Sequence, residues 1–396
     1  MRGKVNTDKL LSLSSKANGG IECTVDESDH PFDDSLIGNM HVHLPVRFVD
    51  GTTWLARIPG HNFTAFSDEL TNQILLSECA TLTWLETANV LAPRLHGCGL
   101  HGDLANEVGV AFMLIDRLLS QPFDQYAATE EQRCKIYAQL GSILTLLSRH
   151  PFDKIGSLTL DKHGSVVVGP VAGDRTGTLS RVGPFHDASS YYVAWVEEYL
   201  RLIASRQLFA RFSSDVCLMF KSLRELATSG KCNTFEKALD SGPFYLKHMD
   251  DKGDHIMVDD DFNITGITDW SFARVVPAYE AFGPSLVTAD MDALYSGRTG
   301  LSQNDKMLAD ALEASGSPVA RFAVAVDRIR RFTFGLGMGM AMNLDEVRAF
   351  FRGIVNTFQK GEEFNWKQWR SEHLKRWGDD EVLRMLLQGE NIGPGH

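Results

Sequence analysis

Hydrophobic and polar residues alternate near the start of the chain in the pattern of a β-strand. Apolar side chains occupy every second position over residues 42–48, with histidine, proline and arginine between them. This period of two is typical of a strand with one buried face. Asp50 and Gly51 then favour a tight hairpin turn, and residues 52–58 form the predicted return strand. Because Pro45 donates no backbone hydrogen bond, the first strand should be bulged or lie at a sheet edge.

The pattern becomes helical over residues 67–90, where apolar side chains recur at spacings of three and four. Pro93 ends this predicted helix. A turn-rich segment follows, and residues 108–116 then form a continuous apolar run of strand character that ends in a short polar stretch before Pro122. The first 115 residues therefore predict an α+β unit.

The chain beyond residue 122 is predicted to be mostly helical. Residues 129–132 have the spacing of a capping box, and Asp187 suits the N-cap of a later helix. One hairpin interrupts the helices, with strands at residues 256–258 and 264–268 around an acidic turn. The pattern indicates no other strand in this part of the chain.

Together these patterns predict an α+β fold with two lobes. We expect a small strand-rich lobe in residues 1–115, a hinge in residues 116–122 and a larger, mainly helical lobe in residues 123–396. A typical domain has roughly 150 residues, so a chain of 396 residues is long enough for two or three such parts. A cleft between two lobes is a natural ligand site.

The composition is that of a globular protein and excludes several functions. Hydrophobic residues make up 43% of the chain and charged residues 23%, which excludes a disordered or fibrous protein. The net charge is −12, from 39 basic and 51 acidic residues, so neither nucleic acid nor an anionic membrane is an expected partner. No apolar run reaches the roughly 18 residues of a membrane span. The N-terminus has no signal-peptide core and the six cysteines are scattered, so we expect a cytoplasmic protein with reduced thiols.

Residues 248–270 carry the densest candidate chemistry. His248, Asp250 and His255 lie in a loop before the predicted hairpin, and Asp269 follows its second strand. A hairpin can bring two such carboxylates side by side. One can then accept a proton from a substrate hydroxyl while the other holds a divalent cation on a triphosphate. Protein kinases use two aspartates at a similar spacing for these tasks.

These residues are similar to the motifs of the aminoglycoside phosphotransferase family, which includes choline-kinase-like enzymes, and the chain resembles its fungal branch. The family's H-G-D-x-x-x-x-N loop corresponds to residues 248–255, and its I-D-W motif to residues 267–270. The resemblance extends through residues 156–170 and 275–285 and covers most of residues 35–290. It implies a protein-kinase-like fold with two lobes and a kinase that acts on small molecules.

The resemblance also implies roles for the residues around the hairpin. Asp250 would be the catalytic base, Asp269 the principal Mg²⁺ ligand and His248 a structural residue of the catalytic loop. His255 stands where the family has a metal-binding asparagine, which makes it the candidate for the second metal contact. An imidazole nitrogen is a poorer ligand for Mg²⁺ than an amide oxygen.

Further positions match the family's ATP-binding residues. Arg57 stands in the place of the strand lysine that contacts ATP phosphates, and Glu78 in the place of its acidic partner. The adenine would meet backbone groups near Asp116 and Leu118. Residues 38–41, with a single glycine, are a poor match for a phosphate-covering loop.

Three functions are compatible with these residues. The first is an ATP- and Mg²⁺-dependent phosphotransferase that acts on a hydroxyl of a small molecule, which the presence of both Asp250 and Asp269 favours. The second is a kinase-fold nucleotide-binding or regulatory protein with little catalysis, which Arg57, His255 and the single-glycine loop favour. The third is a metallohydrolase, and its ligands would be His248, Asp250, Asp254 and His255. No feature of the sequence identifies the acceptor or the oligomeric state.

Overall fold

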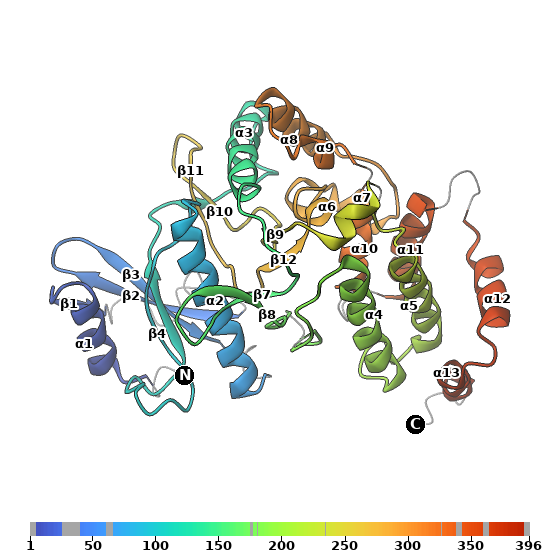
Figure 1. The fold of residues 1–396 in the computed structure, drawn as a ribbon, viewed down its shortest axis with the longest axis horizontal. Coiled ribbons are helices and arrows are strands. Elements are labelled where there is room, and N and C mark those ends of the chain that lie inside the picture. Colours follow the sequence, from blue (N-terminus) through green and yellow to red (C-terminus); the bar gives the residue numbers. More distant parts are fainter. Residues whose placement is uncertain are drawn as a thin grey trace. The chain divides into compact units, whose positions relative to one another are not determined.

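The computed structural model describes residues 5–25, 40–60, 66–174, 177–179, 181–233, 235–325, 327–337, 343–358 and 364–391. An antiparallel sheet has the strand order β1-β2-β3-β5-β4 (Figure 1). Its strands are β1 (Cys23–Val25), β2 (His41–Phe48), β3 (Thr53–Pro59), β4 (Leu95–Gly99) and β5 (Phe112–Asp116). The predicted hairpin is confirmed, because β2 pairs with β3 and places His43 opposite Arg57. Among the described residues β1 pairs only with residues 46–48, so β2 is a sheet edge at Pro45, which has no N–H to donate.

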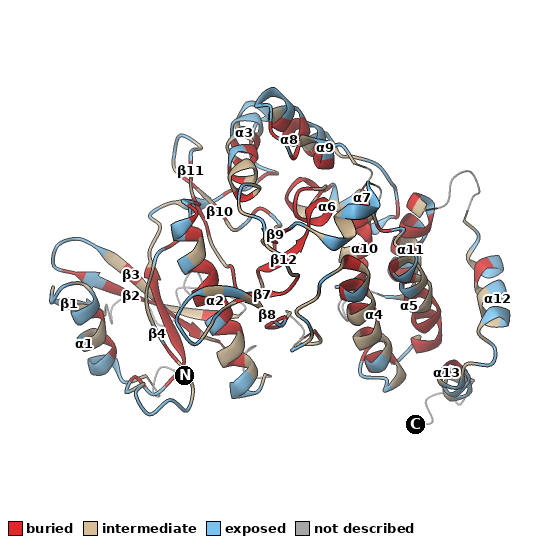
Figure 2. Cartoon of the chain, in the orientation of Figure 1, coloured by how far each residue is buried: buried red, intermediate tan, exposed pale blue. Residues whose placement is uncertain are grey.

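The predicted long helix is α2 (Asp68–Thr87). Its N-cap is Ser67, whose hydroxyl accepts a hydrogen bond from the Leu70 N–H at 3.2 Å. The buried side chains of α2 are mainly apolar, but they also include the carboxylate of Glu78. A shorter helix, α1 (Thr7–Ala17), adds Leu10 to the apolar core formed by the sheet, and Figure 2 shows the buried strands in red. Helix α2 therefore brings one charged group into the interior.

The acidic hairpin is also confirmed. Strands β10 (Ile256–Val258) and β11 (Ile264–Ile267) pair antiparallel, and β6 (Gln121–Pro122) pairs with the other edge of β10. Asp259 closes the turn, since its Oδ1 atom accepts hydrogen bonds from the N–H groups of Asp261 at 3.0 Å and Asn263 at 2.7 Å. The hairpin is therefore a tightly bonded element that can position the residues at its two ends.

The expectation of a single hairpin beyond residue 122 is wrong. A second hairpin consists of β7 (Ser157–Leu160) and β8 (Val166–Gly169), and β9 (Phe244–Lys247) pairs with β12 (Arg274–Pro277). Each of these strands has four residues, and short apolar runs of this kind are ambiguous between strand and helix in a sequence.

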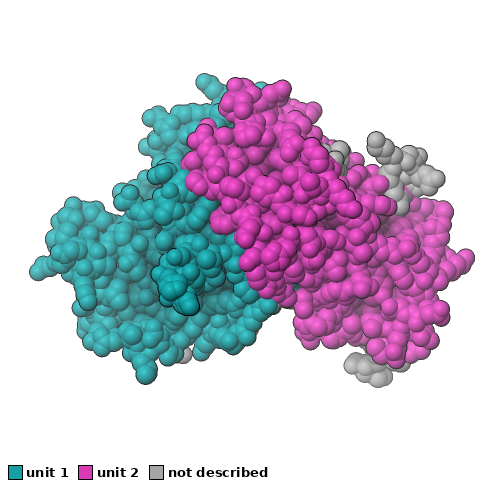
Figure 3. Space-filling model, in the orientation of Figure 1, with its two compact units in different colours: residues 1–139, 157–181, 248–274 teal, residues 140–156, 182–247, 275–396 magenta. Residues whose placement is uncertain are grey.

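Contacts divide the chain into two compact units, coloured separately in Figure 3. The first unit consists of Met1–Gln139, Ser157–Arg181 and His248–Arg274, and the second of Leu140–Gly156, Val182–Lys247 and Val275–His396. The first unit thus contains the five-stranded sheet, α2 and the acidic hairpin, although the hairpin lies far along the chain. This division is based on contacts and does not test the predicted lobes or the hinge at residues 116–122. Both stay predictions.

The second unit is mainly helical, and α3 (Glu130–Leu147) spans the division between the two units. Its α-helices are α4 (Ala188–Ala204), α5 (Ser213–Thr228), α6 (Ala278–Ala281), α7 (Met291–Tyr295), α8 (Gln303–Ala314), α9 (Ala320–Ala323), α10 (Arg328–Leu336), α11 (Leu344–Phe358), α12 (Trp366–Arg376) and α13 (Glu381–Asn391). Asp187 caps α4 as expected, accepting a hydrogen bond from the Ser190 N–H at 2.8 Å. None of the helices in the described part of the chain combines the length and apolarity needed to span a bilayer.

Candidate active site

Arg57 lies at the centre of a buried cluster of charged groups in the first unit. Strand β3 carries the arginine, which is 5% exposed, and its Nη1 and Nη2 atoms form ion pairs with Glu78 and Asp269. The hydroxyl of Ser271 lies 2.9 Å from a carboxylate oxygen of each of these acidic residues. The planar guanidinium suits such a cluster because its donors diverge in a fixed geometry. The predicted contact between Arg57 and Glu78 is therefore present.

Asp269 is held in an unusual backbone conformation two residues after β11. Its φ angle is 58°, in the left-handed region that aspartate adopts more readily than most residues. Burial raises the pKa of its carboxyl, but the charge of Arg57 and the neighbouring histidines lower it more, so the pKa lies well below its usual value. The side chain is still 29% exposed. Asp269 is therefore an ionised and accessible carboxylate at neutral pH.

The pKa of Glu78 is shifted in the opposite direction to that of Asp269, although the two carboxyls share the same surroundings. Burial raises the pKa of its carboxyl, and the charge of Arg57 and the Ser271 hydroxyl only partly oppose this shift. The positive charge of Arg57 therefore offsets the cost of burying the Glu78 carboxylate. The Glu78 carboxylate in turn offsets part of the positive charge of Arg57.

His248 connects the loop before the hairpin to the end of β11. Its Nε2 atom lies 2.8 Å from the carbonyl oxygen of Thr268, and its ring packs edge-on against Trp270 with centroids 4.8 Å apart. Burial lowers the pKa of His248, and the nearby His255 lowers it further. A partly buried imidazole in this place connects the loop that carries Asp250 to the end of β11.

Asp250 and Asp269 approach each other through His255. The Nε2 atom of His255 lies 3.2 Å from Asp250 Oδ2, 3.5 Å from Asp254 Oδ1 and 3.9 Å from Asp269 Oδ2. Burial lowers the pKa of His255, but its hydrogen bond to Asp250 and the charges of the surrounding carboxylates raise it to above its usual value. The hairpin thus brings the two predicted aspartates to one imidazole.

Two residues of this cluster were not identified from the sequence. Lys252 lies with its Nζ atom 3.4 Å from Asp250 Oδ1 and 3.6 Å from Asp254 Oδ2, and its side chain is 41% exposed. Its only sequence signal is that it is the one basic residue between His248 and His255. Ser271 gives no signal at all, because its partners are distant in the chain.

A cavity of about 660 Å³ opens beside this cluster. The sequence-predicted residues that line it are Arg57, Glu78, Asp116, Leu118, His255 and Asp269. Asp250 does not line it but contacts His255 and Lys252, which do. Residues 38 and 39 of the expected phosphate-covering loop lie outside the described residues. All of these lining residues belong to the first unit, so one compact body contains the candidate site.

Asp116, at the end of β5, is also among the residues that line the cavity. Its Oδ1 atom lies 2.6 Å from Nε2 of His96, whose ring stacks on Trp54 with centroids 3.7 Å apart. Burial raises the pKa of Asp116, but the hydrogen bond and charge of His96 and the contacts with Arg94 together lower it more, so the pKa is below its usual value. The Asp116 carboxylate is therefore engaged by His96, and the Asp116 N–H donates a hydrogen bond to the carbonyl oxygen of Arg94 at 3.1 Å.

Three side chains offer possible ligand atoms for a metal ion. One atom each of Asp250, His255 and Asp269 lies within 4.8 Å of the other two. Mg²⁺ in nucleotide-binding enzymes is typically held by one or two carboxylates together with phosphates and water, and the two aspartates fit this requirement. The four-residue set of the alternative metallohydrolase is not assembled in the described residues, because Nε2 of His248 faces the Thr268 carbonyl.

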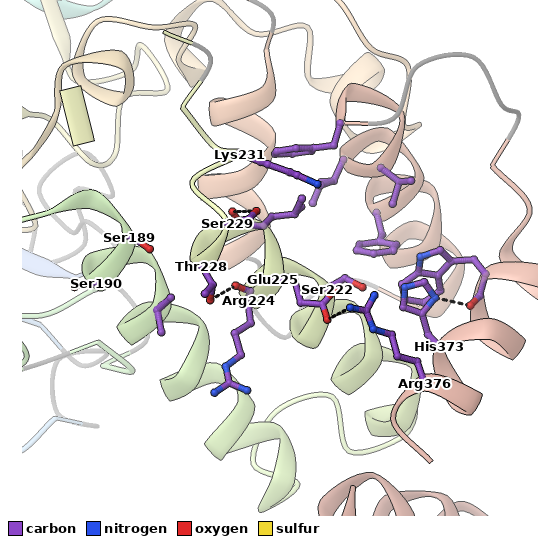
Figure 4. Close-up of a pocket in the computed structure, with 17 residues that line it drawn as sticks. Ser189, Ser190, Ser222, Arg224, Glu225, Thr228, Ser229, Lys231, His373 and Arg376 are labelled. Carbon is purple, nitrogen blue, oxygen red and sulfur yellow. Dashed lines mark hydrogen bonds and ion pairs between the residues drawn. The ribbon is translucent and has the colours of Figure 1, made fainter. Parts of the chain in front are cut away.

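A larger cavity, of about 970 Å³, lies within the second unit (Figure 4). Its lining includes Phe351, Phe358 and Trp369, and an ion pair between Glu225 and Arg376 at 2.6 Å. It contains none of the residues that the sequence identified. The charged groups needed for acid–base chemistry gather in the first unit, so the smaller cavity is the candidate active site.

The sheet, the Arg57–Glu78 ion pair and the acidic hairpin together are the parts of a protein-kinase-like phosphotransferase. The chain belongs to the phosphotransferase enzyme family (APH), whose family model matches residues 48–303. This match confirms the predicted fold class and the predicted class of enzyme, a kinase that acts on small-molecule hydroxyls. The narrower resemblance to a fungal branch stays a prediction.

Solved structures of similar fold include three from different organisms. A Ralstonia eutropha protein assigned as an aminoglycoside phosphotransferase is 13% identical, with a TM-score of 0.50 over 94% of this chain and 99% of that one. Plasmodium vivax ethanolamine kinase is 11% identical (TM-score 0.45, 94% and 85% covered). Streptomyces rimosus APH(3'')-Id, solved with ADP and streptomycin, is 13% identical (TM-score 0.41, 90% and 100% covered). No protein of curated function matches the chain. At these identities the likeness shows the fold alone.

Proposed function

We propose that this protein transfers the γ-phosphoryl group of ATP to a hydroxyl of a small molecule in a Mg²⁺-dependent reaction. The proposal depends on one observation, the convergence of the Asp250 and Asp269 carboxylates on Nε2 of His255, 3.2 and 3.9 Å away. Two carboxylates so placed can divide the work of accepting a proton and holding a cation. Membership of the phosphotransferase family supports this reaction type.

Asp250 is the proposed base. Its buried carboxylate is oriented by His255 on one oxygen and by Lys252 on the other. As the acceptor oxygen bonds to the γ-phosphorus, the hydroxyl proton passes to Asp250, and the bond from phosphorus to the bridging oxygen breaks to leave ADP. Positioning and electrostatic stabilisation should contribute most of the rate enhancement, because the phosphoryl transition state is loose.

The nucleotide would lie in the cavity of the first unit. Asp269 would hold Mg²⁺, with His255 as the candidate second contact, and the bound ion would add positive charge beside the β- and γ-phosphates. Lys252 is the accessible cation next to the proposed base and can approach a phosphate oxygen, while Arg57, kept in place by Glu78, is the proposed contact to the inner phosphates. Backbone groups near Asp116 and Leu118 would meet the adenine.

A nucleotide-binding or regulatory protein with little catalysis is the second candidate. Arg57 favours it, because both of its terminal nitrogens are engaged by carboxylates and only 5% of its side chain is exposed. A cation so enclosed has little surface left for a phosphate. This candidate predicts nucleotide binding without turnover.

The test is an ATP-consumption screen over amino alcohols, sugars and aminoglycosides, with Mg-ATP binding measured on the same preparation. We expect one acceptor class to give turnover, and Asp250→Asn to lower kcat by about a hundredfold or more while ATP still binds. Asp260→Asn is the matched control, because Asp260 is exposed in the hairpin turn and should leave kcat unchanged.

Two results would count against the proposal in different ways. Turnover that survives Asp250→Asn would show that another group is the base. Binding of Mg-ATP with no turnover on any acceptor would favour the regulatory candidate.

A further inference from the structure

His255 is the chemically unusual member of the candidate site. It stands where the resembling motif has an asparagine, so a ring nitrogen takes the place of an amide oxygen between two carboxylates. Mg²⁺ is a hard cation that prefers oxygen ligands. An imidazole nitrogen is better suited to Mn²⁺, Fe²⁺, Co²⁺ or Zn²⁺. The substitution therefore changes which cation the site should prefer.

The fold holds this imidazole in place. The His255 side chain is 18% exposed, and its ring centroid lies 5.4 Å from that of His248. Its carbonyl oxygen accepts a hydrogen bond from the Thr268 N–H at 2.9 Å, which ties it to the strand end before Asp269. A mobile surface histidine would have none of these restraints. His255 therefore lies at the start of the hairpin, between the loop that carries Asp250 and the segment that carries Asp269.

The spacing of the three donors suits a single cation. Around an octahedral ion with bonds of about 2.1 Å, adjacent donors lie about 3 Å apart and opposite donors about 4.2 Å apart. Nε2 of His255 is 3.2 Å from the Asp250 oxygen and 3.9 Å from the Asp269 oxygen. Small side-chain movements would therefore bring His255 and Asp269 to one ion, with Asp250 beside it.

We propose that His255 and Asp269, with Asp250 beside them, form a site for a first-row transition dication, and that His255 makes this site prefer Mn²⁺ to Mg²⁺. The inference rests on the proposed function, because it places the cation where the nucleotide phosphates would lie. On binding, any proton on Nε2 of His255 passes to solvent and the neutral ring donates its lone pair. The Asp269 carboxylate, whose charge Arg57 already offsets in part, contributes negative charge to the ion.

The test measures Mn²⁺ binding to the full chain without nucleotide. Titration followed by electron paramagnetic resonance gives the Kd, and pulsed measurements on the same sample detect coupling between bound Mn²⁺ and a ring nitrogen. For the unmodified protein we expect one Mn²⁺ per chain, nitrogen coupling, and displacement only by a large excess of Mg²⁺. His255→Asn should abolish the coupling and weaken Mn²⁺ binding by about tenfold or more. The preference of the site for Mn²⁺ over Mg²⁺ should therefore become smaller.

His163→Asn is the matched control, because His163 is exposed in the turn between β7 and β8. It should behave as the unmodified protein. If circular dichroism shows that His255→Asn does not fold, the test depends on the unmodified protein alone. Nitrogen coupling to bound Mn²⁺ there would support the proposal, and its absence would overturn it.

The outcomes separate this inference from the proposed function. Absence of nitrogen coupling, or the same preference for Mn²⁺ over Mg²⁺ with and without His255, would overturn the metal assignment even if an acceptor is phosphorylated. Nitrogen coupling without turnover on any acceptor would support the metal assignment and count against phosphoryl transfer.

Discussion

Arg57 forms ion pairs with two carboxylates at once, and these ion pairs determine what the arginine contributes to the stability of the fold. Glu78 and Asp269 come from parts of the chain separated by nearly two hundred residues, and Glu78 is buried where it meets Arg57, whereas Asp269 is partly exposed. A buried ion pair adds little stability over an apolar pair of the same size, but removing one partner leaves an uncompensated charge. The arginine is therefore needed because its partners are charged.

We expect Arg57→Met to lower the free energy of unfolding by about 3–5 kcal/mol, since it leaves Glu78 and Asp269 without their cation. Urea denaturation of the purified protein measures this value. Arg94→Met is the control, because Arg94 is 67% exposed and its ion pair with Glu86 at 3.4 Å should contribute about 1 kcal/mol or less. Equal losses for the two variants would show that the buried cluster does not stabilise the fold.

At the scale of elements, the sequence predicted those with a strong period. Helix α2 and strands β2, β3, β10 and β11 were all expected close to where they lie. Strand β4 was missed because Gly97 and Gly99, which break the alternation, look like turn residues. The sequence predicted most residues of the candidate site. It did not predict Ser271, because the partner of Ser271, Glu78, lies 193 positions earlier in the chain. Only packing creates such a partner.

Strand β11 also shapes the cavity through a glycine. A Cβ atom added at Gly266 would lie 2.7 Å from Cδ1 of Leu118, whose side chain lines the cavity. We expect Gly266→Ala to push Leu118 aside and to raise the Kd for ADP about fivefold, roughly 1 kcal/mol, with little loss of stability. Isothermal titration calorimetry measures the Kd.

The matched control is Gly97→Ala in β4. The nearest atom to a Cβ there is Cδ2 of Leu13 at 3.7 Å, an ordinary contact. This variant should bind ADP as the unmodified protein does. If both alanine variants shift the Kd alike, the contact between Gly266 and Leu118 does not control the nucleotide cavity.

At the scale of the whole molecule, pH has two opposing effects on stability. The net charge is −12 at pH 7 and approaches zero near a pI of about 5.5, so acidification relieves repulsion and favours folding. Against this, burial lowers the pKa of His41 well below its usual value, and the charge of Arg57 lowers it further. The unfolded chain then binds the proton more readily. The stability linked to His41 is therefore present above about pH 6.5 and is lost as the pH falls.

Salt separates the two effects, because at about 1 M the Debye length is only about 3 Å and exposed charges are screened, while the buried His41 is not. In such salt we expect the free energy of unfolding to fall between about pH 7 and about pH 5, and His41→Gln to make that fall shallower. Urea denaturation across this range measures both slopes. The pKa of His255 is raised, so the stability linked to His255 increases as the pH falls, opposite to that of His41. The contribution of His41 is therefore identified by comparing the unmodified protein with His41→Gln, and not from the slope of the unmodified protein alone. An unchanged slope in His41→Gln, matching the exposed control His163→Gln, would show that the pH dependence arises elsewhere.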